Sequence, residues 1–258
     1  MHRDTLIVED GSVRIEAFAQ GSGPLVLLLP SLGRGAEDFD NVSRLIADHG
    51  YRVICPQPRG IGGSTGPMQG TTLHDLARDI ARVIEQQGGS PAIVAGHAFG
   101  NWVARMLAAD RPDLVRGVVL LAAAHRTIEP AMRLSIDKCS DPSVAANERL
   151  DHLRRAYFAA GNDATSWLEG WHKAVAETQR AAGKAVSQDA WWAAGGRVPI
   201  LDVQGRDDAI APNTGSALLR EELGDRVTTV VISNAGHALL PEQPVAVADA
   251  MLAFIGAL

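Results

Sequence analysis

Residues 96–100 place two glycines around a central residue, in the spacing of a turn that presents a nucleophile. In the G-x-S-x-G pattern the serine lies on a sharp strand-to-helix turn, where its hydroxyl is exposed for attack on a carbonyl carbon. Here the central residue is Ala98, with an apolar run before it at 92–95 and a helix-like segment after it at 101–110. Alanine has no hydroxyl, so a covalent intermediate on this side chain is impossible.

Two later loops carry the residue types that would complete such chemistry. Asp207 and Asp208 follow an apolar run at 199–203, and His237 follows another at 227–232. A histidine can act as a general base, and a carboxylate can fix its tautomer and stabilise its protonated form. Turn residue, acid and histidine occur here in one of the chain orders known for a catalytic triad.

Strand-like and helix-like segments alternate around these motifs. A hairpin signal at 9–12 links two short strand patterns, and the apolar run at 25–29 is typical of a strand buried on both faces of a sheet. Helix-like segments at 39–48 and 72–86 each precede another strand. Such alternation predicts right-handed crossovers and a mostly parallel α/β sheet.

The alternation stops between residues 127 and 196, where the chain has helical stretches and no convincing strand. An open α/β sheet binds ligands at the carboxyl ends of its strands. We therefore predict a core domain formed by residues 1–126 and 197–258, with a helical cap inserted at 127–196. Four of the five tryptophans lie in this insertion: Trp167, Trp171, Trp191 and Trp192.

The combined motifs make the chain resemble the α/β-hydrolase superfamily over essentially its whole length. The resemblance implies a doubly wound, mostly parallel sheet with an inserted helical cap, and a hydrolase similar to esterases, lactonases and epoxide hydrolases. It matches His237 to the general base and Asp208 to the acid, three residues after the glycine of a G-x-x-D pattern. Asp207 remains the alternative acid.

The same resemblance implies an oxyanion hole in the loop after residue 29. The family commonly has His-Gly there, whereas this chain has Pro30 and Ser31. The expected donors are the backbone N–H groups of Leu32 and Phe99, which do not depend on side chains. For Ser31 there are two interpretations: a substitute nucleophile or extra donor beside the substrate, or a small residue that satisfies its own turn.

Other side chains have both a functional and a structural interpretation. Trp167 and Trp171 are four residues apart and would form either an aromatic wall for substrate or the core of the cap. His125 ends the strand that leads into the cap, where it would face the pocket or make a structural hydrogen bond. His97 is expected to point into packing, and Arg34 to be a solvated loop residue unless it meets a substrate carboxylate.

Three hypotheses account for Ala98. A serine was replaced in the laboratory, or the alanine is natural and the enzyme acts without a covalent intermediate, or the fold has become a ligand-binding protein. Members of the superfamily with a non-serine turn exist, including aminoacrylate hydrolases of pyrimidine breakdown whose turn resembles G-H-A-L-G. The paired departures at Ser31 and Ala98 favour natural divergence. A lyase or oxygenase that needs no cofactor and uses the same base is the alternative enzyme class.

Charge and composition limit the partners. The formal net charge of −6 argues against nucleic acid and against an anionic membrane surface, because both attract cationic proteins. No apolar run approaches the ~20 residues that span a bilayer, and the first residues lack the apolar core of a secretory signal. Cys55 and Cys139 form no metal-ligand spacing. We expect a cytoplasmic protein that takes a small-molecule substrate and needs neither metal nor cofactor; its oligomeric state stays open.

Overall fold

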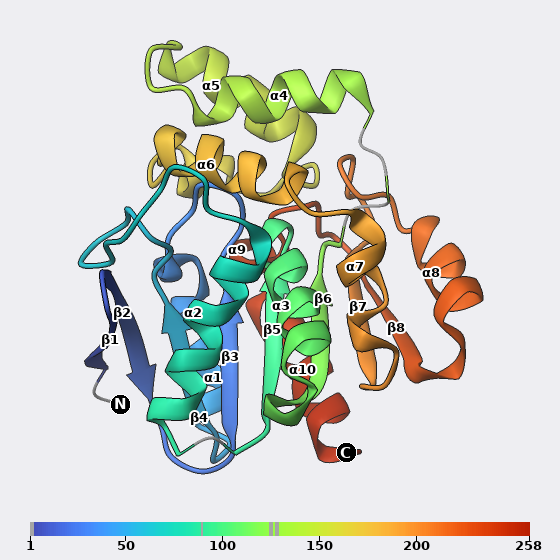
Figure 1. The fold of residues 1–258 in the computed structure, drawn as a ribbon. Helices are drawn as coiled ribbons and strands as arrows, with labels where there is room; N and C mark the ends of the chain where they lie inside the picture. The colour runs from blue at the N-terminus through green and yellow to red at the C-terminus, as the bar shows by residue number, and fades with distance from the viewer. Residues whose placement is uncertain (1–2, 89, 124–125, 127–128) are drawn as a thin grey trace.

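A computed structural model describes residues 3–88, 90–123, 126 and 129–258 (Figure 1). The described chain forms an eight-stranded sheet in the order β1-β2-β4-β3-β5-β6-β7-β8. Strand β2 runs antiparallel to β1 and β4, and the other neighbours are parallel. This confirms the predicted fold class. The strands are β1 (Asp4–Asp10), β2 (Val13–Gln20), β3 (Leu25–Leu29), β4 (Arg52–Pro56), β5 (Ala92–His97), β6 (Val115–Leu121), β7 (Ile200–Gly205) and β8 (Val227–Ile232).

Helices cover both faces of the sheet, which explains the continuous apolar strands. In β3, Leu27 and Leu29 pack in the core on the side of α2 and α3, while Val26 and Leu28 pack in the core on the side of α1 and α10. Successive side chains of a strand point to opposite faces, so a strand covered on both needs an apolar residue at every position. The helices of these layers are α1 (Asp40–Ala47), α2 (Leu73–Gln86), α3 (Phe99–Asp110), α8 (Gly215–Leu223), α9 (Leu239–Glu242) and α10 (Pro244–Gly256).

Helix α2 illustrates how local sequence sets a boundary. The Thr72 hydroxyl accepts a hydrogen bond from the backbone N–H of Asp75, and the Asp75 carboxylate accepts one from the backbone N–H of Thr72. This reciprocal capping box satisfies two N–H groups that the first turn leaves without partners. The helix therefore begins within one residue of the predicted position.

Four α-helices of the described residues follow β6 and precede β7: α4 (Pro130–Ser140), α5 (Ala146–Ala156), α6 (Lys173–Lys184) and α7 (Gln188–Trp192). In Figure 1, α4, α5 and α6 stand beyond the upper ends of the central parallel strands. Helix α7 instead packs beside α3, where the Trp191 ring stacks on Trp102 at 5.0 Å between centroids. The last part of the segment predicted as a cap thus contacts the core. Within the described ranges, no helix has the length and apolar character needed to cross a membrane.

Candidate active site

Ala98 occupies a strained turn between β5 and α3. Its backbone has φ 44° and ψ −109°, a conformation that costs a non-glycine residue about 1–3 kcal/mol. The Ala98 N–H donates a hydrogen bond to the carbonyl oxygen of Leu121 at 2.9 Å, which fastens the turn to the end of β6. A Cβ on Gly96 would collide with the backbone of Gly100, and one on Gly100 would collide with the carbonyl oxygen of Leu29. Both glycines of the motif are therefore required by close packing.

His237 and Asp208 form a buried pair beside the sheet's carboxyl edge. The Nδ1 atom of His237 lies 2.9 Å from Oδ2 of Asp208, and both side chains are nearly inaccessible to solvent. The other carboxylate oxygen of Asp208 accepts hydrogen bonds from the N–H groups of Ile210 and Ala211, each at 2.8 Å. A carboxylate accepts only, so the proton of this bond is on Nδ1, and Nε2 is the lone-pair nitrogen of the neutral ring. Asp207 is exposed, and of the two alternatives for the acid it is Asp208 that meets the histidine.

His97 forms a hydrogen bond with the loop that carries His237. This residue ends β5, is fully buried, and donates a hydrogen bond from Nε2 to the backbone carbonyl oxygen of His237 at 2.8 Å. Burial, and secondarily the charge of His237, lowers the pKa of His97 to about 3, so its ring stays neutral. The packing role expected for His97 is confirmed. No sequence pattern predicted its hydrogen bond to His237, which lies 140 positions away in the chain.

The predicted oxyanion donors lie in the loop after β3, at Leu32, and at the start of α3, at Phe99. Neither the N–H of Leu32 nor that of Phe99 donates a hydrogen bond to another described residue. The next N–H, that of Gly33, is already used: it donates to Oε1 of Gln179 on α6 at 2.7 Å. Ser31 is buried in the same loop, and no hydrogen bond joins its hydroxyl to a described residue. Gln179, which sequence patterns did not indicate, therefore links this loop to the inserted helices.

Aromatic residues from the insertion pack against both histidines. The Trp167 ring lies 5.7 Å from that of His97, and the Tyr157 ring lies 5.5 Å from that of His237. Trp167 also packs edge-on against Trp171 at 5.9 Å, and the Trp171 indole donates to the Trp167 carbonyl oxygen. Trp167 thus belongs to the core of the insertion and also reaches the His97 ring. The predicted substrate contact of His125 lies outside the described residues.

Arg34 is buried, so its predicted place as a solvated loop residue is wrong. Its guanidinium lies 4.6 Å from the Trp167 ring and 4.7 Å from the Trp171 ring. It also forms a bidentate pair with Asp38 and donates to the carbonyl oxygen of Glu169. Arg34 therefore fastens the loop after β3 to the insertion, because a guanidinium can stack and donate in several directions at once.

Glu242 makes a second connection between the insertion and the histidine loop. Its carboxylate accepts hydrogen bonds from the N–H groups of Gly236 and Ala159, both at 2.7 Å, and from the side-chain amide of Asn162 at 2.6 Å. Burial raises the pKa of this carboxyl group above its usual value. In the sequence Glu242 lies five residues after His237.

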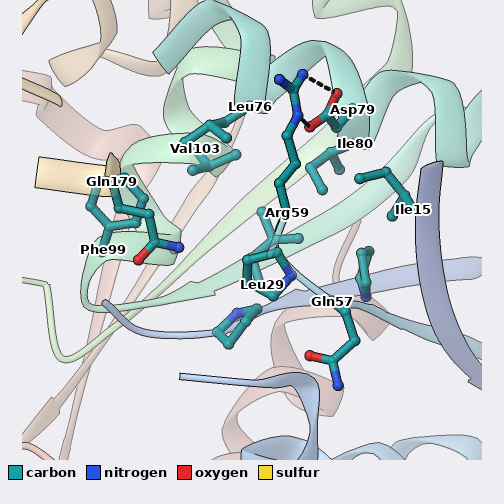
Figure 2. A pocket seen from close by; sticks show the side chains of 14 residues that line it. Ile15, Leu29, Gln57, Arg59, Leu76, Asp79, Ile80, Phe99, Val103 and Gln179 are labelled. Atoms are coloured by element: carbon teal, nitrogen blue, oxygen red, sulfur yellow. Dashed lines mark hydrogen bonds and ion pairs between the residues drawn. The ribbon is translucent and has the colours of Figure 1, made fainter. Parts of the chain in front are cut away.

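A small cavity of about 50 Å³ lies next to the turn, on the side of α2 and α3 (Figure 2). Phe99, Leu29 and Val103 form part of its apolar wall, and Gln179 reaches it from α6. Arg59 and Asp79 line another wall as a bidentate ion pair at 2.6 and 2.7 Å. Because each charge has its partner, this pair leaves the cavity neutral.

A protein-family model described as "Alpha/beta hydrolase family" matches residues 26–250. The curated "Epoxide hydrolase A" of Mycobacterium tuberculosis is 23% identical over 96% of this chain and 96% of its own length. A "Putative carbamate hydrolase" of Variovorax paradoxus is 28% identical over 86% of this chain and 88% of its own. Among solved structures, a putative lipase from Acinetobacter baumannii AYE superposes with a TM-score of 0.81 at 18% identity, covering 99% of this chain and 91% of that one.

Proposed function

The chain belongs to the alpha/beta hydrolase family, and on this premise we propose that it hydrolyses a small organic ester, or a similarly activated carbonyl or imine compound, without a covalent intermediate. The observation that carries the proposal is the buried His237–Asp208 pair beside a strained turn that holds alanine. The strained backbone at Ala98 costs stability, and burial of the Asp208 carboxylate is offset by the three hydrogen bonds that it accepts. Their presence together supports a working base beside a turn that carries no nucleophilic side chain.

In the proposed reaction, Nε2 of His237 takes a proton from a water molecule as its oxygen attacks the electrophilic carbon. Asp208 keeps Nδ1 protonated and stabilises the imidazolium that forms. The N–H groups of Leu32 and Phe99 hold the negative charge that develops on the carbonyl oxygen. The imidazolium then returns the proton to the leaving group, so one water is consumed and one bond to the carbonyl carbon is broken. The methyl group of Ala98 leaves space for the water where a serine hydroxyl would otherwise stand.

We propose that α4, α5 and α6 act as the cap over this site. The packing of Tyr157 on the His237 ring supports this role, as do the contacts of Gln179 and Arg34 with the loop after β3. In this arrangement the His237 side chain is only 4% exposed, so substrate entry requires the inserted helices to move. The carbamate hydrolase named among the relatives supports a small carbonyl compound as the substrate class.

Turnover of a short panel of activated esters and carbamates, with mass spectrometry of the protein, tests the mechanism. We expect hydrolysis by the unmodified chain, a loss of about 10²–10⁴-fold in His237→Ala, and no gain in Ala98→Ser. Mass spectrometry of the protein during turnover is expected to find no acyl adduct. An adduct on Ser31 would assign that hydroxyl the nucleophile's role and contradict the proposal.

The remaining outcomes identify the alternatives. An inert chain that becomes a fast, His237-dependent esterase as Ala98→Ser would show that the fold performs covalent catalysis and lacks only its serine. If both forms are inert while a panel member binds equally well to the His237→Ala variant, the site is one for binding rather than hydrolysis.

A further inference from the structure

The loop after β3 packs on the core at its beginning and on the insertion at its middle. The carbonyl oxygens of Leu29 and Pro30 lie close to Gly100 near the start of α3, where a Cβ would collide with both. The next residues form a turn, 31–34, in which the N–H of the last residue donates to the carbonyl oxygen of the first at 3.1 Å. The N–H of Leu32, one of the two proposed oxyanion donors, lies inside this turn. The position of that donor therefore depends on what holds the turn.

Gly33 joins this turn to helix α6 through two hydrogen bonds. Its N–H donates to Oε1 of Gln179 at 2.7 Å, and its carbonyl oxygen accepts from the N–H of His172, the residue before α6, at 2.8 Å. A Cβ on Gly33 would lie 2.8 Å from the Cβ of Ala176, so the backbone of the turn packs directly on the helix. Gly33 has φ 64°, a conformation that glycine adopts without strain. Both backbone polar groups of this residue are therefore bonded to α6 or to the residue before it.

Gln179 supplies the side chain in this connection. It is only 5% exposed, and Gly33 is buried as well. A buried N–H without a partner costs stability, so the Gly33 N–H needs the amide oxygen of Gln179 to keep its present place. Gln179 and Phe99 also line the same small cavity next to the Ala98 turn (Figure 2). Gln179 thus lies where the loop after β3, helix α6 and this cavity meet.

The second proposed oxyanion donor is held in a different way. Phe99 is the first residue of α3, and the N–H of the preceding Ala98 donates to the carbonyl oxygen of Leu121 at the end of β6. Neither of these connections involves the insertion. One donor is therefore fixed to the sheet, whereas the turn that contains Leu32 is fixed to α6. An oxyanion hole requires both donors within about 2.7–3.1 Å of one oxygen atom, so its geometry depends on the contact between α6 and the turn.

We infer that Gln179 is a positioning residue of the oxyanion hole. Its amide oxygen holds Gly33 and thereby places the N–H of Leu32 so that it and the N–H of Phe99 reach one substrate oxygen. The inference rests on the proposed hydrolysis and goes beyond it, because it makes catalysis depend on the contact between α6 and the turn. A substrate that binds while α6 is displaced is held but not hydrolysed. Gln179 itself acts only through Gly33 and contacts no reacting atom.

Steady-state hydrolysis of the panel of activated esters by Gln179→Met and Gln179→Asn tests the inference. Methionine keeps the length of the side chain without the amide, and asparagine keeps the amide on a side chain too short to reach Gly33. Each variant is expected to lower kcat about 10–100-fold and to change KM less than about 3-fold, because the charge on the carbonyl oxygen develops only in the transition state. Glu177→Met, at an exposed position of the same helix, is the control and should keep both constants.

Hydrogen exchange of the Gly33 amide measures the state of the turn without any substrate. Both Gln179 variants are expected to speed this exchange at least about 10-fold, while the amides of β5 stay protected. Unchanged kcat in both variants would overturn the role of Gln179 and leave the proposed hydrolysis intact. Faster exchange throughout β5 in both variants would assign the loss of activity to the fold and would also overturn it. If the unmodified chain hydrolyses no member of the panel, the proposed function fails and the inference fails with it.

Discussion

Nε2 of His97 donates a hydrogen bond to the backbone carbonyl oxygen of His237 at 2.8 Å, and the two rings lie 5.4 Å apart. The residue that immediately precedes the alanine of the turn thus sets the position of the loop that carries His237. The Nδ1–Asp208 bond fixes the ring of His237, while the His97 bond fixes its backbone. The turn at Ala98 and the loop that carries His237 are therefore joined by the His97 ring, which stays neutral and does not take up a proton near neutral pH.

The neutral state of His97 predicts that stability falls in mild acid. Its pKa is about 3 in the folded chain and near 6.5 when unfolded, so between these values the unfolded chain binds more protons. Above about pH 6.5 His97 is neutral in both states and costs no stability. Lowering the pH from 7 to 5 is expected to reduce the free energy of unfolding by about 2 kcal/mol. Urea titrations of the unmodified chain at both pH values measure it. His97→Asn should flatten this pH dependence, whereas His49→Asn, at an exposed position, should not; equal slopes in all three proteins would argue against it.

Asp208→Asn is expected to lower kcat by about 10²–10⁴-fold with little change in stability. An amide in place of the carboxylate no longer stabilises the imidazolium and can donate to Nδ1, which favours the wrong tautomer. Asp207→Asn is the matched control at the neighbouring exposed position and should keep full activity. Steady-state kinetics of the two variants make the comparison, and equal losses in both would contradict the assignment of Asp208.

Arg34→Met is expected to destabilise the fold by about 3–5 kcal/mol, because it leaves the Asp38 carboxylate buried without its partner. Arg44→Met removes an ion pair of the same i,i+4 spacing, between Arg44 and Asp48 at 3.5 Å, but on an exposed surface. That change is expected to cost less than about 1 kcal/mol. Urea-induced unfolding of both variants measures the difference. A mild effect of Arg34→Met would mean that this loop is not held by the guanidinium.

Glu242→Gln is expected to lower both stability and turnover. One carboxylate now accepts from Gly236, Ala159 and Asn162, and an amide cannot accept from all three. We expect a loss of about 1–3 kcal/mol in unfolding free energy, together with a lower kcat because the loop that carries His237 loosens. Glu221→Gln, at an exposed position of α8, is the control. Unchanged kcat in a destabilised Glu242→Gln would limit this residue to a structural role.

Local sequence determined most of the fold and the place of His237 after the last strand. Alternating apolar strands and helices predicted a parallel sheet, since each period depends only on residues close together in the chain. The glycines around Ala98 and the histidine after the last strand were equally local signals. Prediction was weakest for the inserted helices, where apolar and aromatic residues at helical spacing did not indicate which neighbour each helix contacts. Helix α7 accordingly packs on α3 through Trp191 and Trp102, inside the boundaries predicted for the cap.

Only the tertiary structure decided which of two adjacent aspartates meets His237. Asp207 and Asp208 have the same chemistry. The backbone N–H groups of the following turn donate to the Asp208 carboxylate, and this orients Asp208 inward. The burial of Arg34 between two tryptophans and the hydrogen bond from His97 to His237 were decided in the same way. The contacts of Arg34 and His97 join residues more than 100 positions apart, and Asp208 lies 29 positions from His237. The sequence shows periodicity and local motifs directly. Which distant side chains meet depends on how the helices pack on the sheet and on one another.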